Sequence, residues 1–196
     1  MPVLVIAIGY ILGSIPFGLV LTRITGAGDL RKIGSGNIGA TNVLRTGRKG
    51  LAALTVLLDG GKGAVAVFIG AALVPEGGAA LGGVMAFLGH CYPVWLRFRG
   101  GKGVATMLAV TLALYWPAGL IFAATWLVML GLTRISSAAG MSAAVAAAAA
   151  VWLMGEPALF RPVAAMAAML LWRHRTNIAR LLKGTEPRVG KKSGAA

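Results

Sequence analysis

The chain alternates long apolar stretches with short polar segments. A helix of roughly 20 apolar residues suffices to cross the hydrocarbon core of a bilayer. The composition agrees with this pattern, because 58% of the 196 residues are hydrophobic. The pattern therefore predicts an all-α integral membrane protein with apolar runs at about 3–22, 51–74, 79–96, 104–133, 138–154 and 158–172.

The run at 104–133 is too long for a single crossing. As one helix it would measure about 45 Å, against a hydrocarbon core of roughly 30 Å. The sequence YWPAG at 115–119 supplies a break with interfacial aromatic residues. Splitting the run gives about seven transmembrane or partial helices. The short segment near 79–91 is expected to be a partial or buried helix.

The charges predict an orientation. The chain carries 19 Lys and Arg against 5 Asp and Glu, a net charge of +14. The first charge, Arg23, follows the first apolar run, which is the wrong polarity for a cleaved signal peptide. Seven crossings with the N-terminus outside place every Lys and Arg except Arg161 and Lys62 on the inner side, as the positive-inside rule requires. We expect one membrane domain at 1–186 and a basic cytoplasmic tail at 187–196.

Composition also excludes several classes. Nucleic-acid-binding proteins can be equally basic, but they are not this apolar, so no nucleic-acid partner is expected. The single cysteine, Cys91, excludes an intramolecular disulfide and a cysteine-based zinc site.

The loop at 28–50 holds more than the basic residues that orientation requires. It interleaves glycines with neutral hydrogen-bonding groups and with Arg45, whose planar guanidinium suits phosphate. An anion site and a flexible surface loop are both open on the residues alone. The neutral polar side chains in question are Ser35, Asn37, Thr41 and Asn42.

The tetrad Gly-Gly-Lys-Gly occurs twice, at 60–63 and at 100–103. Neither copy is a Walker A loop, because Gly follows each lysine and no Gly stands five residues before the Gly-Lys pair. Both are expected where a helix enters the membrane from the inner side, and a helix N-terminus there favours an anion. Lys102 has two arginines close by, whereas Asp59 and Lys62 lie three residues apart and can simply pair.

The two histidines differ in their surroundings. His90 lies in an apolar setting, where a structural hydrogen bond is the usual role, and Trp95 stands where a His-x4-Asp acyltransferase motif needs Asp. His174 and Asn177 are expected on one face of the last helix. That helix end could instead anchor in anionic lipid headgroups. Ser137 opens a helix, where capping is the default role.

These polar groups converge on the inner membrane surface, which favours a site that meets a soluble anion and a lipid chain. A phosphate or organic-anion transporter is the alternative, although transporters usually place their site near the midplane. A non-catalytic lipid-binding scaffold is a third possibility that explains the dense polar motifs less well.

The motifs resemble those of the bacterial acyl-phosphate:glycerol-3-phosphate acyltransferases, in order and spacing across nearly the whole chain. They are YILGSIPFG at 10–18, GSGNIGATNVLR at 34–45, DGGKG at 59–63, GHCYPVW at 89–95, RGGKGVAT at 99–106 and HRTNIARLLKGTE at 174–186. The resemblance implies a seven-helix enzyme of the bacterial inner membrane whose active site faces the cytoplasm.

The resemblance also implies a reaction. A fatty acyl group would pass from acyl phosphate to the 1-hydroxyl of glycerol 3-phosphate, giving lysophosphatidic acid and phosphate, the first acylation of phospholipid biosynthesis. No metal, nucleotide or other cofactor is implied, and neither acyl-CoA nor acyl carrier protein would be the direct donor. The enzyme would work in the lipid bilayer and depend on another enzyme that makes acyl phosphate.

Site residues follow from the matched motif positions. Ser35, Asn37, Arg45 and Lys102 would hold glycerol 3-phosphate, and Lys102, His174 and Asn177 would be catalytic. The acyl phosphate would be bound by Ser137, His174, Asn177, Gly101 and Gly103, although Ala139 and Gly140 stand where relatives often carry another hydroxyl residue. Supporting positions are Asn42, Asp59, Lys62, His90, Arg99, Thr106 and Glu186.

Overall fold

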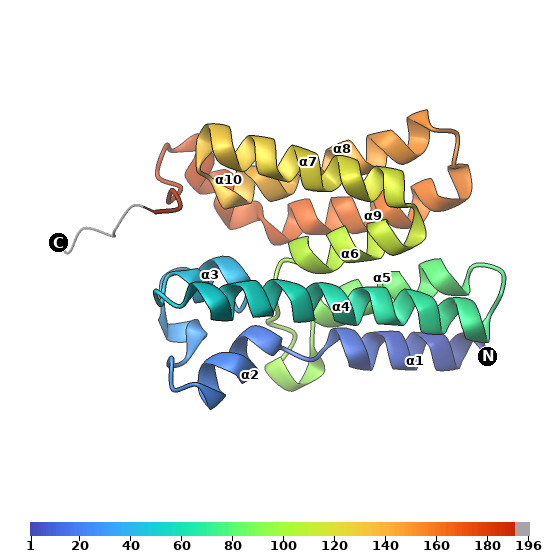
Figure 1. Ribbon diagram of the computed structural model, residues 1–196, viewed down its shortest axis with the longest axis horizontal. Coiled ribbons are helices and arrows are strands. Elements are labelled where there is room, and N and C mark those ends of the chain that lie inside the picture. The colour runs from blue at the N-terminus through green and yellow to red at the C-terminus, as the bar shows by residue number, and fades with distance from the viewer. Residues whose placement is uncertain (191–196) are drawn as a thin grey trace.

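The computed structural model describes residues 1–190, which fold into α-helices and two 3-10 turns (Figure 1). Five stretches are long and apolar enough to cross a membrane, the first combining α1 and α2. The prediction of an all-α integral membrane protein is therefore confirmed. The elements are α1 (Pro2–Gly13), α2 (Phe17–Ile24), η1 (Leu30–Lys32), α3 (Ala40–Leu44), α4 (Lys49–Leu73), α5 (Gly78–Cys91), η2 (Val94–Leu96), α6 (Val104–Leu114), α7 (Trp116–Thr133), α8 (Ser136–Leu153), α9 (Pro157–Arg173) and α10 (Arg175–Leu182).

The first apolar run is not one helix, as the sequence pattern predicted, but two. Pro16 lacks a backbone N–H and disfavours helical backbone at the residue before it, so the chain breaks between α1 and α2. Side chains from elsewhere satisfy carbonyl groups at the break. Lys62 Nζ donates to the Ile15 carbonyl at 2.7 Å, and Trp95 Nε1 donates to the Ser14 carbonyl at 2.8 Å.

The run at 104–133 does divide as predicted. Tyr115 is extended, with φ −155° and ψ 91°, and separates α6 from α7. Pro117 begins α7, where its missing N–H removes no helical bond.

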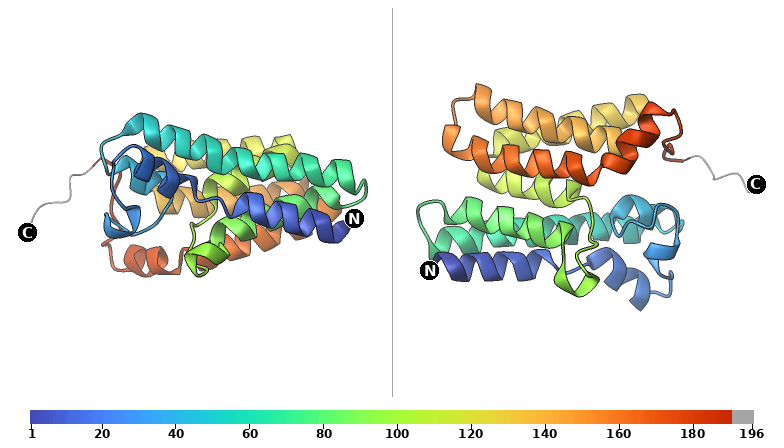
Figure 2. Two further views of the ribbon diagram at one scale, coloured as in Figure 1. Left: turned by 90° about the horizontal axis from the view of Figure 1, so that it is seen from below. Right: turned by 180° about the vertical axis from the view of Figure 1, so that it is seen from behind.

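Helices α5 and α6 are both short, although α5 together with η2 forms one of the five stretches that are long and apolar enough to cross a membrane. Their 14 and 11 residues correspond to about 21 and 17 Å. Figures 1 and 2 show α5 running from the end that holds the chain N-terminus to the middle of the molecule, and α6 running back. The connecting loop at 97–103 therefore lies between the two ends of the bundle, and α5 is the short helix predicted near 79–91.

Helices α7, α8 and α9 form one group, α1, α4 and α5 form another, and α6 lies between them (Figure 1). Close packing depends on small residues. A Cβ on Gly13 would lie 2.0 Å from the Ala86 carbonyl oxygen, so α1 and α5 approach to backbone contact. A fully buried apolar core joins the groups and includes Phe87, Met107 and Phe122.

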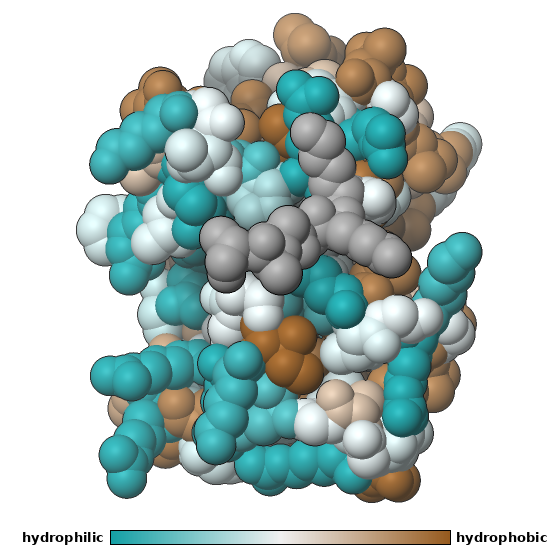
Figure 3. Space-filling model, turned by 90° about the vertical axis from the view of Figure 1, so that its left-hand side faces the viewer, coloured by the Kyte–Doolittle hydropathy of each residue, from teal (hydrophilic) through white to brown (hydrophobic). Residues whose placement is uncertain are grey.

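We call the end that holds α3, α10 and the start of α8 the basic end. Hydrophilic side chains gather on this face of the molecule (Figure 3). Near the predicted domain boundary, Glu186 bonds to Arg180 and the Val189 amide donates to the Arg134 carbonyl. The predicted tail extends to 196, and its residues 191–196 lie outside the described residues.

Candidate active site

The loop at 97–103 returns against the end of α5 before α6 begins. Its turn uses left-handed backbone at Arg97 and at Gly103, the N-cap of α6, where φ is 84°. A Cβ on Gly103 would lie 2.1 Å from the Phe87 ring. The amides of Gly100 and Gly101 donate to the last carbonyls of α5. Lys102 is thereby fixed at the N-terminus of α6, as predicted for the second tetrad.

Lys102 belongs to a hydrogen-bonded network that joins distant segments. Its Nζ donates to Asn177 Oδ1 at 2.6 Å, and Asn177 Nδ2 donates to Glu186 Oε1 at 2.5 Å. Glu186 also accepts from Ser137 Oγ at 2.7 Å and from Arg180 Nε at 2.6 Å. We call these five residues the Lys102 network. Glu186, predicted as a supporting residue, is its central acceptor.

The network is electrostatically positive. Burial lowers the pKa of Lys102 to about 8, and the charges of Arg180, Arg173 and Arg45 act in the same direction against that of Glu186. Burial alone would raise the pKa of Glu186, but the donors from Ser137, Asn177 and Arg180 outweigh it and hold the pKa below its usual value. One carboxylate thus faces several cations, which leaves net positive charge for an anionic ligand.

His174 lies buried at the junction of α9 and α10. Its Nδ1 is 2.8 Å from the Leu170 carbonyl, so Nδ1 carries the proton and Nε2 keeps its lone pair. Burial lowers the pKa of His174 to about 4, and the charge of Lys102 contributes to this. The ring is therefore a neutral acceptor near pH 7. Asn177, one turn later, is also buried.

Arg173 bridges the two helix groups and was not among the predicted site residues. Its guanidinium donates to the Gly100 and Gly101 carbonyls at 2.8 and 3.0 Å and lies 4.9 Å from the Tyr92 ring centroid. Arg173 and Arg180 form a basic stripe in the sequence, which was the only available signal. Both arginines prove to be structural partners of the site.

The loop at 28–48 is organised by Asn42, which is buried. Its amide donates to the carbonyls of Leu30, Ile33 and Asn37 at 2.8 to 2.9 Å. Its Oδ1 accepts from the Ser35 amide at 3.2 Å and from Arg45 at 3.4 Å. These hydrogen bonds fix the backbone of the loop, which is therefore ordered and not a flexible surface loop.

This loop borders the Lys102 network. The charge of Arg45 lowers the pKa of Lys102, and Thr41 Oγ1 lies 3.0 Å from Ser136 Oγ at the start of α8. Ser35 and Arg45 are exposed and Asn37 is half-buried, so all three are accessible to a soluble ligand. Neither Ser136 nor Ser137 caps α8, contrary to the default role expected for them.

The first tetrad is placed differently from its prediction. Residues 60–63 do not open a helix, since α4 begins at Lys49 and Lys62 lies about 20 Å further along its axis. The predicted pairing of Lys62 with Asp59 is confirmed at 2.7 Å. This pair lies in the core beside His90 and Thr106, and outside the Lys102 network.

Arg99 and Gly101 complete the predicted set. Arg99 is exposed, and its side chain makes no hydrogen bond or ion pair within residues 1–190. Gly101 is buried directly before Lys102. Among the described residues, no three His, Cys, Asp or Glu side chains are grouped as a metal site would require.

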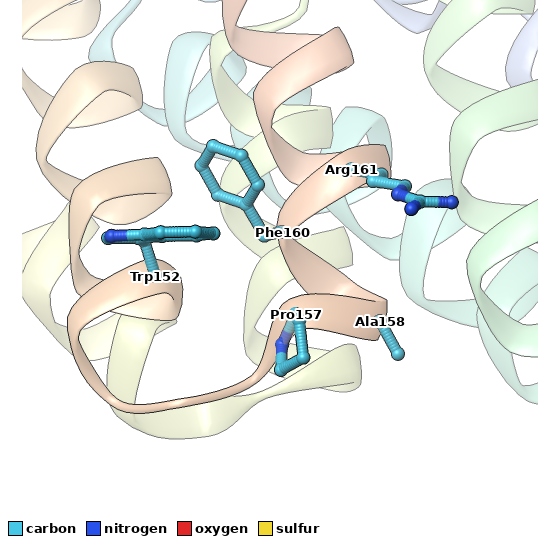
Figure 4. Close-up of a pocket in the computed structure, with 5 residues that line it drawn as sticks. All are labelled: Trp152, Pro157, Ala158, Phe160 and Arg161. Atoms are coloured by element: carbon cyan, nitrogen blue, oxygen red, sulfur yellow. The ribbon is translucent and has the colours of Figure 1, made fainter.

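A surface pocket of about 520 Å³ lies at the opposite end of the molecule (Figure 4). Trp152 and Phe160, with ring centroids 5.0 Å apart, lie on one side of α9, and Arg161 extends from the other side. The pocket offers no acid or base to a substrate, so it is not the candidate active site.

Comparison with known proteins identifies one family. The family model "Glycerol-3-phosphate acyltransferase" matches residues 3–184. Glycerol-3-phosphate acyltransferases of Erythrobacter litoralis and Novosphingobium aromaticivorans are 58% and 60% identical to the chain. The matches cover 97% of this chain and 96% of the first relative, and 95% of this chain and 94% of the second.

Solved structures of PlsY, an integral membrane glycerol 3-phosphate acyltransferase, are also similar. The glycerol 3-phosphate form matches with a TM-score of 0.91 and 36% identity, over 96% of each chain. The lysophosphatidic acid form matches with a TM-score of 0.90 and 35% identity, over 96% of this chain and 95% of that one. The chain therefore belongs to the glycerol-3-phosphate acyltransferase family of integral membrane proteins.

Proposed function

We propose that this protein transfers a fatty acyl group from acyl phosphate to the 1-hydroxyl of glycerol 3-phosphate, giving lysophosphatidic acid and phosphate. The reaction would take place on the cytoplasmic side of the bacterial inner membrane. The observation that carries the proposal is the Lys102 network, which gathers positive charge beside a helix N-terminus and close to the neutral His174. Family membership and the two named ligand forms of the solved relative support the acceptor and the product.

The phosphate of glycerol 3-phosphate would lie between the loop at 28–48 and the start of α6. Lys102 and Arg45 would supply its countercharges, and Ser35 and Asn37 would donate neutral hydrogen bonds. The backbone amides of Lys102 and Gly103 donate no hydrogen bond within residues 1–190. Free amides at a helix N-terminus are well placed to bind an anion.

The acyl phosphate would approach from the side of α8 and α9. Ser137, His174, Asn177 and the backbone at Gly101 and Gly103 would surround its head. A surface groove of about 520 Å³ continues from there, lined by Met141, Ser142, Val145, Ala146 and Leu171. Met141 lies one turn after Ser137 and Leu171 one turn before His174, so the groove begins beside the site. Its apolar lining suits a fatty chain.

The chemistry needs no acyl-enzyme, because acyl phosphate is already activated. The substrate hydroxyl oxygen forms a bond to the acyl carbonyl carbon, the bond from that carbon to the phosphate oxygen breaks, and phosphate leaves. Lys102, Asn177 and free backbone amides would stabilise the developing oxyanion. The neutral Nε2 of His174 would accept the hydroxyl proton, for which it is available at any pH well above 4.

A transporter for phosphate or organic anions is the alternative. The loop at 97–103 lies deeper than predicted, a feature that a transporter would share. The region between this loop and the opposite end is filled, however. Phe87, Met107, Val110 and Phe122 are each 0% exposed, so these apolar side chains are closely packed there. This closed core favours an enzyme open to one side.

The test is to incubate purified protein in detergent with glycerol 3-phosphate and, in separate reactions, palmitoyl phosphate, palmitoyl-CoA or palmitoyl acyl carrier protein. We expect lysophosphatidic acid from palmitoyl phosphate alone. Equal formation of lysophosphatidic acid from palmitoyl-CoA would refute acyl phosphate as the specific donor. No lysophosphatidic acid from any of the three donors would refute the proposed acyltransferase function. Near-normal turnover in His174→Ala would show that a substrate phosphate, and not His174, accepts the hydroxyl proton.

A further inference from the structure

A second group of charged side chains lies in the core next to the loop at 97–103. Asp59, Lys62 and His90 are only 3%, 6% and 5% exposed. Lys62 Nζ is 2.7 Å from Asp59 Oδ1, and His90 Nδ1 is 3.6 Å from the same oxygen. We call these three residues the Asp59 cluster. None of them reaches the proposed substrate positions, so the proposed chemistry leaves the cluster unexplained.

The cluster holds together segments that are distant in sequence. Lys62 Nζ also donates to the Ile15 carbonyl at the break between α1 and α2. The backbone carbonyl of Asp59 accepts from Thr106 Oγ1 at 2.8 Å, which ties the first turn of α6 to α4. The ion pair thus joins α4 to the break between α1 and α2, and the backbone of Asp59 joins α4 to the first turn of α6, just after the loop that carries Lys102.

His90 extends this contact to the loop. Its carbonyl accepts from the Gly101 amide at 3.0 Å. Its ring lies against the Gly101 Cα so closely that a Cβ there would be 2.0 Å from Nε2 and 2.8 Å from Cε1. Gly101 directly precedes Lys102. Both the backbone and the ring of His90 therefore restrict the position of the Lys102 backbone.

We propose that the Asp59 cluster is a positioning device that fixes the Gly101–Lys102 segment through His90. This inference rests on the proposed function, because it assumes that Lys102 binds substrate. A buried ion pair is a poor source of stability compared with apolar residues of similar size, since desolvation offsets much of the attraction. Positioning of the adjacent loop would explain why the protein contains this buried ion pair, whereas a contribution to stability would not.

The neutral pair Asp59→Asn/Lys62→Met separates positioning from stability, because it keeps volume and removes both buried charges. We expect a midpoint of thermal unfolding close to the wild-type value and a kcat/KM for glycerol 3-phosphate lowered on the order of tenfold, since small displacements of a catalytic group are costly. Deuterium exchange at the amides of 100–103 should be faster. Wild-type kinetics and exchange in this variant would overturn the proposal.

A second pair of substitutions tests the contact between His90 and Gly101 directly. Gly101→Ala should lower kcat/KM by about a hundredfold, and His90→Ala in the same chain removes the ring that the new Cβ meets. The double variant should recover at least about tenfold over Gly101→Ala. Gly61→Ala is the matched control, because nothing lies within 4 Å of its added Cβ.

No recovery in the double variant would overturn the role of His90. This outcome is distinguishable from failure of the proposed function, because in that case the wild-type protein itself would form no lysophosphatidic acid.

Discussion

The two Gly-Gly-Lys-Gly tetrads have identical residues and opposite environments. Lys62 lies in the middle of α4, 6% exposed and bonded directly to Asp59. Lys102 lies in a loop at the start of α6, and its ammonium reaches the carboxylate of Glu186 only through Asn177. One lysine is fully neutralised within the core, whereas the other keeps charge available to a ligand.

The difference shows that the backbone around a lysine decides its role. In the first tetrad every glycine is helical, so all backbone amides except those at the helix start are used. In the second tetrad Gly103 is left-handed and ends the loop, which exposes amides next to the ammonium. A charged side chain together with free amides is suited to phosphate, whereas the charge alone is not.

The largest expected contrast comes from removing each charge. Lys102→Met should lower kcat/KM on the order of 100- to 1000-fold, as loss of an oxyanion donor does, with little change in thermal unfolding. Steady-state kinetics and calorimetry on the same preparation measure both quantities. A Lys102→Met protein that unfolds early but turns over normally would reverse the assignment of the two tetrads.

Lys62→Met should show the opposite profile. It leaves Asp59 buried without its partner, which costs about 3–5 kcal/mol of unfolding free energy. The neutral pair with Asp59→Asn serves as the control and should regain most of that stability. If Lys62→Met alone were as stable as the wild type, the buried pair would not be the structural element described above.

Substitution of one glycine in each tetrad should also have different effects on activity. Gly103→Ala places a Cβ 2.1 Å from the Phe87 ring at a φ of 84°, and we expect at least about a tenfold loss of kcat/KM. Gly61→Ala meets nothing within 4 Å and should stabilise α4 by about 0.5–1 kcal/mol. Equal effects of the two substitutions on activity would remove the contrast.

The smallest expected effect is on pH dependence. Lys102 must be charged to bind phosphate, and its pKa is lowered to about 8. It is protonated below that value and neutral above it, so kcat/KM for glycerol 3-phosphate should fall as pH rises past about 8. Lys102→Arg should shift this fall to higher pH, because guanidinium stays charged. An unchanged alkaline limb in Lys102→Arg would assign it to another group.

Sequence patterns predicted the apolar helices and the division at Tyr115, because length and an interfacial Pro leave few alternatives there. They missed the division at Pro16. A hydropathy average does not register one proline in an apolar run, and the carbonyl groups freed at the break are satisfied by Lys62 and Trp95 from distant segments.

The site was predictable where its side chains contact one another. The convergence of Lys102, Asn177 and Ser137 followed from motifs at helix ends. Arg173 was missed because it donates to backbone carbonyls of the loop. Every residue type has such a carbonyl, so the sequence does not indicate which ones act as acceptors. The depth of the loop was missed too, since it depends on α5 ending and α6 beginning halfway along the bundle.

The most direct test of the account is the equilibrium dissociation constant of glycerol 3-phosphate, measured by isothermal titration calorimetry without an acyl donor. Wild type and Gly61→Ala should bind equally, and Lys102→Met should bind at least about tenfold more weakly, as loss of a charge-assisted contact requires. A Lys102→Met protein that binds glycerol 3-phosphate as tightly as the wild type would contradict the claim that the second tetrad is the phosphate site.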